Sequence, residues 1–155
     1  MPMRVYFAGS IRGGRQDADL YRELIDFIKG YADVLTEHVG DQSLTDAQGE
    51  CYDASYIHTR DLDWLKLSDV MIAEVTTPSL GVGYEIATAI HLNRKVLCLY
   101  HPLKGRKLSA MIAGSPAVEV YTYTGIEEAK KAIAAFLNMY KIHFITLPTL
   151  SVSFE

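Results

Sequence analysis

Short apolar runs alternate along the chain with longer segments in which apolar residues recur every three or four positions. The short runs are rich in β-branched and aromatic residues, which favours strands. They cover residues 5–8, 34–36, 70–75, 96–100 and 118–121. The periodic segments predict helices near 17–30, 54–67, 83–93, 107–113 and 125–140. In the first of these, one apolar face is formed by Leu20, Leu24, Phe27, Ile28 and Tyr31.

This alternation predicts an α/β fold. Parallel strands joined by crossovers of a dozen or more residues form right-handed βαβ units, so we expect a doubly wound five-stranded parallel sheet with helices on both faces. The polar segment 39–53 predicts a long loop, which at that length is expected to be functional or mobile. We expect one domain over residues 1–140. The tail, residues 141–155, is expected to form an added edge strand or a dimer arm, or to be disordered.

Composition narrows the class of protein without indicating its chemistry. The chain has 155 residues, which is enough for one domain. Hydrophobic residues make up 49% and charged residues 22%, a composition that excludes a disordered chain. A net charge of -4 argues against a general nucleic-acid surface but leaves room for a pocket that takes a small anion. We expect no membrane span and no signal peptide. Two cysteines exclude a disulfide scaffold and predict a cytoplasmic protein, also nuclear if the source is a eukaryote.

The loop after the first strand, GSIRGGR at residues 9–15, has the residue types of an anion site. Glycines such as Gly13 allow close backbone approach, Ser10 offers a hydroxyl, and Arg12 offers a guanidinium fork suited to phosphate. The Lys followed by Ser or Thr of a P-loop is missing. An ordinary glycine turn with solvated arginines is the alternative.

The loop after the third strand, TTPSLGVGYE at residues 76–85, resembles half of a dinucleotide fingerprint. Ile86 stands where the third glycine belongs, and the loop follows the third strand, so a dinucleotide site is disfavoured. Ser79 and the backbone amides around Gly81 could instead hold an anion. We expect Glu85 in the first turn of the next helix, where the dipole favours an ionised carboxylate suited to a nucleophile or base. The alternative is a glutamate that only favours the helix start.

A third candidate lies in the segment HTRDLDWL at residues 58–65. We expect Asp61 at the margin of the apolar stripe and Asp63 pointing elsewhere. His58 and Asp61 have a spacing that metal ligands use, but no third ligand is evident, so a helix-surface pair is favoured over a metal site.

Other chemistry-bearing residues are expected at the same edge of the sheet. His38 follows the second strand, Tyr6 lies on the first, and Ser109 with Met111 could cap a helix or touch a ligand. Two carboxylates, a tyrosine, serines and an arginine suffice for glycosyl transfer, although their spacing alone does not select that reaction.

Several motifs, in order and at nearly constant spacing over residues 4–137, resemble those of the 2'-deoxynucleoside 5'-phosphate N-hydrolases, a family within the nucleoside 2-deoxyribosyltransferase group. They are VYFAGSIRGGR at 5–15, VLTEHV at 34–39, DLDWL at 61–65, AEVT at 73–76, PSLGVGYE at 78–85 and LSAMI at 108–112. The resemblance implies a Rossmann-like (flavodoxin-like) five-stranded sheet, a homodimer, and a reaction that uses no metal and no organic cofactor.

The resemblance also implies roles for individual residues. Glu85 matches a nucleophile that forms a covalent glycosyl-enzyme, Asp61 a second carboxylate that assists departure of the base and activates water, and Tyr6 a tyrosine that orients the nucleophile. The implied substrate-binding residues are Ser10, Ile11, Arg12, Gly13, His38, Ser79, Gly81, Ser109 and Met111. Of these, Ser109 is expected to come from the partner subunit, and His38 and Ile11 to face the base.

The function implied is hydrolysis of 2'-deoxynucleoside 5'-monophosphates to a free base and 2-deoxyribose 5-phosphate. The nearest alternative is a deoxyribosyltransferase, which passes the sugar to another base. A non-catalytic nucleotide-binding module is the second alternative. The loop after His38 departs from the family pattern, so the preferred base stays open.

Overall fold

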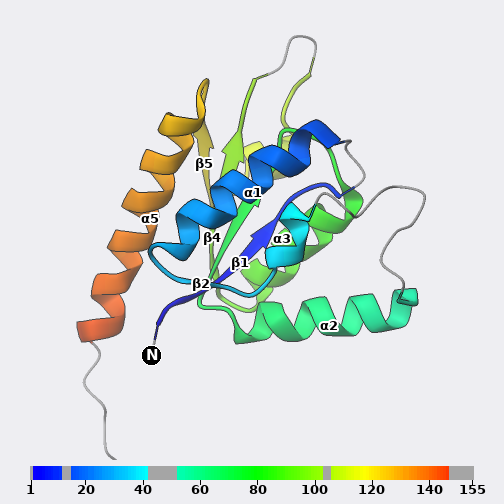
Figure 1. Cartoon of the computed structure of the whole chain (residues 1–155), viewed down its shortest axis with the longest axis horizontal. Coiled ribbons are helices and arrows are strands. Elements are labelled where there is room, and N and C mark those ends of the chain that lie inside the picture. The colour runs from blue at the N-terminus through cyan, green and yellow to red at the C-terminus, as the bar shows by residue number, and fades with distance from the viewer. Residues whose placement is uncertain (1, 12–14, 42–51, 103–105, 147–155) are drawn as a thin grey trace, which may run out of the picture.

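One parallel sheet organises the chain, which a computed structural model describes over residues 2–11, 15–41, 52–102 and 106–146 (Figure 1). The elements follow the order β1 (Arg4–Ala8), α1 (Arg15–Lys29), β2 (Asp33–Val34), η1 (Glu37–Gly40), α2 (Ala54–Leu67), β3 (Val70–Glu74), α3 (Leu80–His91), β4 (Lys95–Tyr100), α4 (Ala110–Ala113), β5 (Val118–Thr122) and α5 (Ile126–Thr146). Within these residues the strand order is β2-β1-β3-β4-β5, all parallel. The predicted doubly wound, flavodoxin-like sheet is confirmed.

The sheet is covered on both faces because side chains alternate along each strand. Val5 and Phe7 of β1 pack into a core with α1 and α5. Tyr6 and Ala8 point to the opposite face, into a second core with α2 and α3. Figure 1 shows α1 and α5 running side by side over one face. This alternation places the Tyr6 side chain on the same face as α2 and α3, the helices that carry the two predicted carboxylates.

Side-chain caps decide where two of the helices on this face begin. Asp53 accepts a hydrogen bond from the Tyr56 amide, so α2 spans residues 54–67 as predicted. Ser79 accepts from the Val82 amide at 3.3 Å, so α3 begins at Leu80, three residues earlier than predicted. Glu85 therefore lies in the second turn of α3, and its predicted place in the first turn is wrong.

Other boundaries also differ from the predictions. Helix α4 covers only residues 110–113, because Ser109 caps it by accepting from the Met111 amide. The start of the predicted 39–53 loop is partly the 3-10 helix η1, and residues 42–51 lie outside the described part of the chain.

Helix α5 continues to Thr146, so residues 141–146 are helical and form no edge strand; the first proline after them is Pro148. Among the described residues, no helix is long and apolar enough to cross a membrane.

Candidate active site

The candidate site lies where the strand order reverses, between the neighbouring strands β1 and β3. Ala8 pairs with Ala73, so the loops that follow these two strands leave the sheet at the same carboxyl edge. In open α/β sheets, ligands bind in the crevice at this switch point. The loop after β1 carries Ser10 and Ile11, and the loop after β3 leads through Ser79 into α3.

A buried tyrosine and a glutamate form the centre of the site. The Tyr6 hydroxyl donates a hydrogen bond to Glu85 Oε1 at 2.7 Å, joining β1 to α3. The pKa of Glu85 is raised to about 7: burial is the main cause, the hydrogen bond from Tyr6 opposes the rise, and the negative charge of Asp61 adds to it. Burial and the charge of Glu85 also raise the pKa of Tyr6, which therefore stays protonated and able to donate.

These facts correct the expected electrostatics of Glu85. The helix dipole acts mainly within the first turn, and Glu85 is one turn further along. Desolvation consequently dominates, and the carboxyl holds its proton more tightly than a glutamate in water. With a pKa of about 7, a large fraction is nevertheless ionised at neutral pH and can attack an electrophilic carbon.

Asp61 belongs to a polar cluster on α2 that faces the same region. Its Oδ1 accepts a hydrogen bond from Arg60 Nε at 2.8 Å and lies 2.7 Å from Arg60 Nη2 in an ion pair. The Arg60 guanidinium lies 4.7 Å from the Trp64 ring centroid, and its Nη2 is 3.5 Å from Nε2 of His38. As predicted, Asp63 points elsewhere: its side chain is 59% exposed and pairs with Lys66.

His58 takes no part in this cluster. Its Nε2 lies 3.2 Å from the Tyr84 hydroxyl, whereas Asp61 is paired with Arg60, so the predicted pairing of His58 with Asp61 is wrong. The reason is that α3 packs beside α2 and offers Tyr84 to His58. Among the described residues, no three His, Cys, Asp or Glu side chains are grouped so that they could hold a metal ion.

The predicted anion-binding residues lie at the edge of this centre. Ser10 is buried, and its amide donates to the Tyr21 hydroxyl at 3.1 Å, while Ile11 is 41% exposed. Gly9 is needed here, because a Cβ at this position would lie 2.7 Å from the Tyr21 ring. Gly81 lies in the first turn of α3. The backbone N–H groups of a first turn point out of the N-terminal end of the helix, where they can bind an anion. Arg12 and Gly13 lie outside the described residues.

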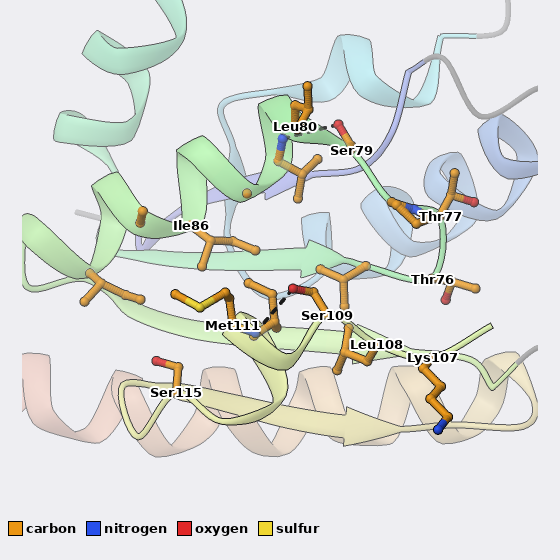
Figure 2. Close-up of a pocket in the computed structure, with 17 residues that line it drawn as sticks. Thr76, Thr77, Ser79, Leu80, Ile86, Lys107, Leu108, Ser109, Met111 and Ser115 are labelled. Atoms are coloured by element: carbon orange, nitrogen blue, oxygen red, sulfur yellow. Dashed lines mark hydrogen bonds between the residues drawn. The ribbon is translucent and has the colours of Figure 1, made fainter.

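A groove of about 690 Å³ lies on the other side of α3 (Figure 2). Figure 2 shows α3 along one wall and the segment 107–115 along the other, with Ser79 and Ser109 both on its lining. None of Tyr6, Asp61 and Glu85 lines this groove. Apolar side chains dominate its rim, and two of them are strongly exposed: Leu80 at 97% and Met111 at 84%.

Sequence reasoning missed a buried glutamate at the end of β3. Glu74 is 1% exposed and accepts hydrogen bonds from the hydroxyls of Thr76 and of Tyr123, the latter at 3.1 Å. Thr76 Oγ1 in turn accepts from the His101 amide at 2.9 Å. Burial raises the pKa of Glu74. The network anchors the loop that leads to Ser79, and one acidic residue in the otherwise apolar run VMIAEV was the signal for it.

Arg60 was also missed as a member of the site. It directly precedes Asp61, and sequence alone indicates an exposed helix arginine at that position. The fold brings it against His38, which comes from the segment after β2, so its side chain is only 14% exposed. The contact with His38 depends on packing between distant segments, and no local pattern announces it.

The site holds a half-buried carboxylate that a tyrosine bonds, and a second carboxylate acts on it electrostatically. These are the groups of an enzyme that cleaves glycosidic bonds. Comparison with known proteins is consistent with this class. The family model described as Nucleoside 2-deoxyribosyltransferase matches residues 5–116, and the chain belongs to this family.

Curated relatives narrow the class further. The chain is 54% identical over 118 residues to a 5-hydroxymethyl-dUMP N-hydrolase of Tetraodon nigroviridis, covering 73% of this chain and 80% of that protein. It is 43% identical over 154 residues to the 5-hydroxymethyl-dUMP N-hydrolase of Mus musculus, covering 99% and 88%. These relationships confirm the resemblance to the N-hydrolases and make the chain an N-glycoside hydrolase.

A solved structure shares the fold. The CMP N-glycosidase BcmB of Clostridium botulinum superimposes with a TM-score of 0.59 at 20% sequence identity, over 85% of this chain and 98% of that one. At this identity the likeness supports the architecture alone.

Proposed function

We propose that this protein hydrolyses the N-glycosidic bond of 2'-deoxynucleoside 5'-monophosphates, releasing the nucleobase and 2-deoxyribose 5-phosphate. The observation that carries the proposal is the Tyr6–Glu85 hydrogen bond, with the charge of Asp61 acting on the same carboxyl. The names of the curated relatives, which are hydrolases of a pyrimidine deoxynucleotide, support the substrate class.

In the first step, ionised Glu85 attacks the anomeric carbon of the deoxyribose. A bond forms between a carboxylate oxygen and C1', the bond from C1' to the base nitrogen breaks, and its electron pair leaves with the base. Tyr6 holds Oε1 and thereby aims the nucleophile. The carboxylate is half-buried and already partly desolvated, so less solvation must be removed from it before the attack than from an exposed glutamate.

In the second step, water attacks C1' of the glycosyl-enzyme. Asp61 accepts the water's proton, the bond from C1' to the Glu85 oxygen breaks with its electron pair returning to the carboxylate, and Asp61 then passes the proton to the base anion. Both carboxylates are thereby regenerated. Hydrolysis, rather than transfer to a second base, requires that water reach C1' before another base does. Base exchange, in which the sugar passes to a second base, is the second candidate function. It is supported by the family model, which is described as Nucleoside 2-deoxyribosyltransferase.

We assign the 5'-phosphate to the loops around Ser10, Ser79 and Gly81, with Arg12 as a further ligand. The capped N-terminus of α3 supplies amides and a favourable dipole for an anion. A phosphate held there anchors the part of the substrate remote from the reacting carbon, and the binding energy aligns C1' with Glu85. This also accounts for an anion site in a chain of net charge -4.

We also propose that two chains pair through the groove beside α3, so that Ser109 completes the phosphate site of the partner subunit. Leu80 and Met111 are strongly exposed and line the same apolar groove, which supports an interface there, because apolar side chains that are exposed together often mark a protein–protein contact. Within one chain, Ser109 and Ser79 line the same groove. The alternative is therefore that Ser109 serves the phosphate loop of its own chain.

Mixing inactive variants distinguishes these two arrangements. E85A and S109A chains are co-refolded at equal concentration. If Ser109 acts across the interface, a mixed dimer contains one complete site, and activity exceeds that of either variant alone. If Ser109 acts within its own chain, no site is repaired and the mixture shows only the residual S109A rate. The second result, or a monomer in sedimentation, rejects the shared site.

Product analysis tests the reaction itself. The enzyme is incubated with a panel of deoxynucleotides, the matching deoxynucleosides and an acceptor base. We expect free base and 2-deoxyribose 5-phosphate from the monophosphates, and E85A should lose turnover while still binding nucleotide. Dominant base exchange supports the transferase instead. Binding without turnover by the wild-type protein supports a non-catalytic module, and undiminished turnover by E85A rejects the nucleophile.

A further inference from the structure

Helix α1 carries two side chains that hold the loops to which the 5'-phosphate is assigned (the phosphate loops, around Ser10 and Ser79). In its first turn, Asp17 Oδ2 accepts a hydrogen bond at 2.9 Å from the hydroxyl of Thr77, which lies two residues before Ser79. One turn further along, the Tyr21 hydroxyl accepts from the Ser10 amide at 3.1 Å. Residues four apart lie on one face of a helix, so a single face of α1 holds both loops.

The anchor on the β1 side is rigid. Tyr21 is 1% exposed, and its ring packs edge-on against Phe7 of β1 with 5.9 Å between the ring centroids. Gly9 lies so close to the same ring that a Cβ there would be 2.7 Å from it. Packing of this density leaves no space for a ring to swing. The Tyr21 hydroxyl therefore occupies a fixed point relative to the sheet and fixes the Ser10 amide with it.

The loop after β3 is held at two consecutive threonines. The Thr76 hydroxyl donates to Glu74, at the end of the same strand, so this bond ties the loop back to β3. The Thr77 hydroxyl donates instead to Asp17, and both of these residues are half-buried. Ser79 follows two residues later and caps α3. The bond to Asp17 consequently fixes where Ser79 and the first amides of α3 lie relative to the loop after β1.

A phosphate that binds to both loops at once depends on the distance between them. Hydrogen bonds weaken steeply when the donor and the acceptor are misplaced, and donors that are already held in place lose little conformational freedom on binding. The residues that fix the two loops therefore add to the affinity for phosphate without contacting it. A ligand that lacks the phosphate gains nothing from the same spacing.

We propose that Asp17 and Tyr21 are positioning residues that set the separation of the two phosphate loops and thereby establish the preference for a 5'-phosphorylated substrate. The proposal rests on the proposed function and on its assignment of the 5'-phosphate to these loops. Asp17 acts through Thr77 and Ser79, and Tyr21 acts through Ser10. Helix α1 thus serves as the spacer between two loops that meet only in the folded chain.

Ligand binding to the E85Q chain tests this arrangement, because a chain without the nucleophile should not consume its ligand. Titration calorimetry gives the Kd of dUMP, and inorganic phosphate competing with dUMP reports the phosphate loops without the sugar or the base. The parent E85Q is compared with chains that also carry T77V, D17A or both, and with T77S, which keeps the hydroxyl. The matched control is T124V, which removes a threonine hydroxyl that donates to Glu128 at 3.0 Å on the exposed surface.

We expect T77V to raise the Kd of dUMP about tenfold, the effect of one well-placed hydrogen bond, and to raise that of phosphate by the same factor. Replacing Asp17 also removes a negative charge, so the informative comparison is the effect of T77V with and without Asp17. In the D17A chain, T77V should have no further effect. Y21F, which leaves the Ser10 amide without its acceptor, should weaken both ligands. T77S and T124V should match the parent.

The role of Asp17 is wrong if T77V leaves the Kd of dUMP unchanged or acts equally with and without Asp17. The role of Tyr21 is wrong if Y21F leaves that Kd unchanged. Weaker binding of dUMP at unchanged phosphate affinity places the effect outside the phosphate loops and overturns the proposal. Phosphate that does not compete with dUMP in the parent overturns the phosphate assignment and the proposal with it.

Structural damage gives a different result from misplaced loops. A chain that is partly misfolded shows fewer binding sites at an unchanged Kd, whereas misplaced loops raise the Kd at a full number of sites. Turnover of dUMP by the wild-type protein is measured separately. A wild-type protein that binds dUMP without hydrolysing it overturns the proposed function, while the binding series still decides whether the two residues position the phosphate loops.

Discussion

Replacing Glu85 with glutamine should abolish turnover and stabilise the folded protein at neutral and alkaline pH. The glutamine oxygen can still accept the hydrogen bond from Tyr6, so the change removes little except a buried ionisable group. The same burial that raises the pKa of Glu85 makes its charge costly to the fold. A site that needs a desolvated nucleophile therefore carries a stability cost that the variant relieves.

The size of the effect follows from the pKa in the two states. It is about 7 in the folded protein against an ordinary value of 4.5. A difference of about 2.5 pH units corresponds to about 3 kcal/mol when the titration is complete. The folded state binds the proton more tightly, so this stabilisation of wild type is fully present below pH 4.5. It is lost as the pH rises to about 7 and beyond.

Urea unfolding of wild type and E85Q at pH values from 4.5 to 8.5 measures this difference directly. The free energies of unfolding should agree within about 1 kcal/mol at pH 4.5 and diverge to about 3 kcal/mol in favour of E85Q at pH 8.5. For a chain of this size, that corresponds to a rise in Tm of about 6–12 °C. The exposed control E127Q should follow wild type across the range. A difference between wild type and E85Q that is constant with pH would refute the reasoning.

Three further substitutions test the supports of the site. Y6F removes the bond that lowers the pKa of Glu85, so the acidic limb of the kcat/KM profile should move to higher pH; an unmoved limb contradicts this. G9A places a Cβ 2.7 Å from the Tyr21 ring and should cost about 1–3 kcal/mol in urea unfolding, whereas a neutral result means the ring moves freely. T36V removes a buried hydroxyl that bonds the backbone of β1 at 2.9 Å and 2.6 Å; we expect a loss of about 1–3 kcal/mol in thermal unfolding, largely restored by T36S.

The strands and the sheet were predictable because their signals are local. The central strands β1, β3 and β4 are short apolar runs that are largely buried, and the long segments between the strands favour parallel pairing. Helix α2 was predicted with its observed ends, since Asp53 is an evident cap. Helix α3 was placed three residues late, because its capping residue, Ser79, was interpreted as part of an anion-binding loop. A serine can cap a helix and also lie beside an anion, so the residue type alone did not fix the start of the helix.

The sequence by itself determined the alternation of strands and helices, the burial of β1 and β3, and which residue types gather at the carboxyl edge. Tertiary structure alone decided how those residues act on one another. Tyr6 and Glu85 are 79 positions apart, and their bond exists only because β1 and α3 pack on the same face of the sheet. The pKa of Glu85 and the contact of Arg60 with His38 likewise come from packing. Desolvation and charge act through space, so local sequence patterns carry no measure of them.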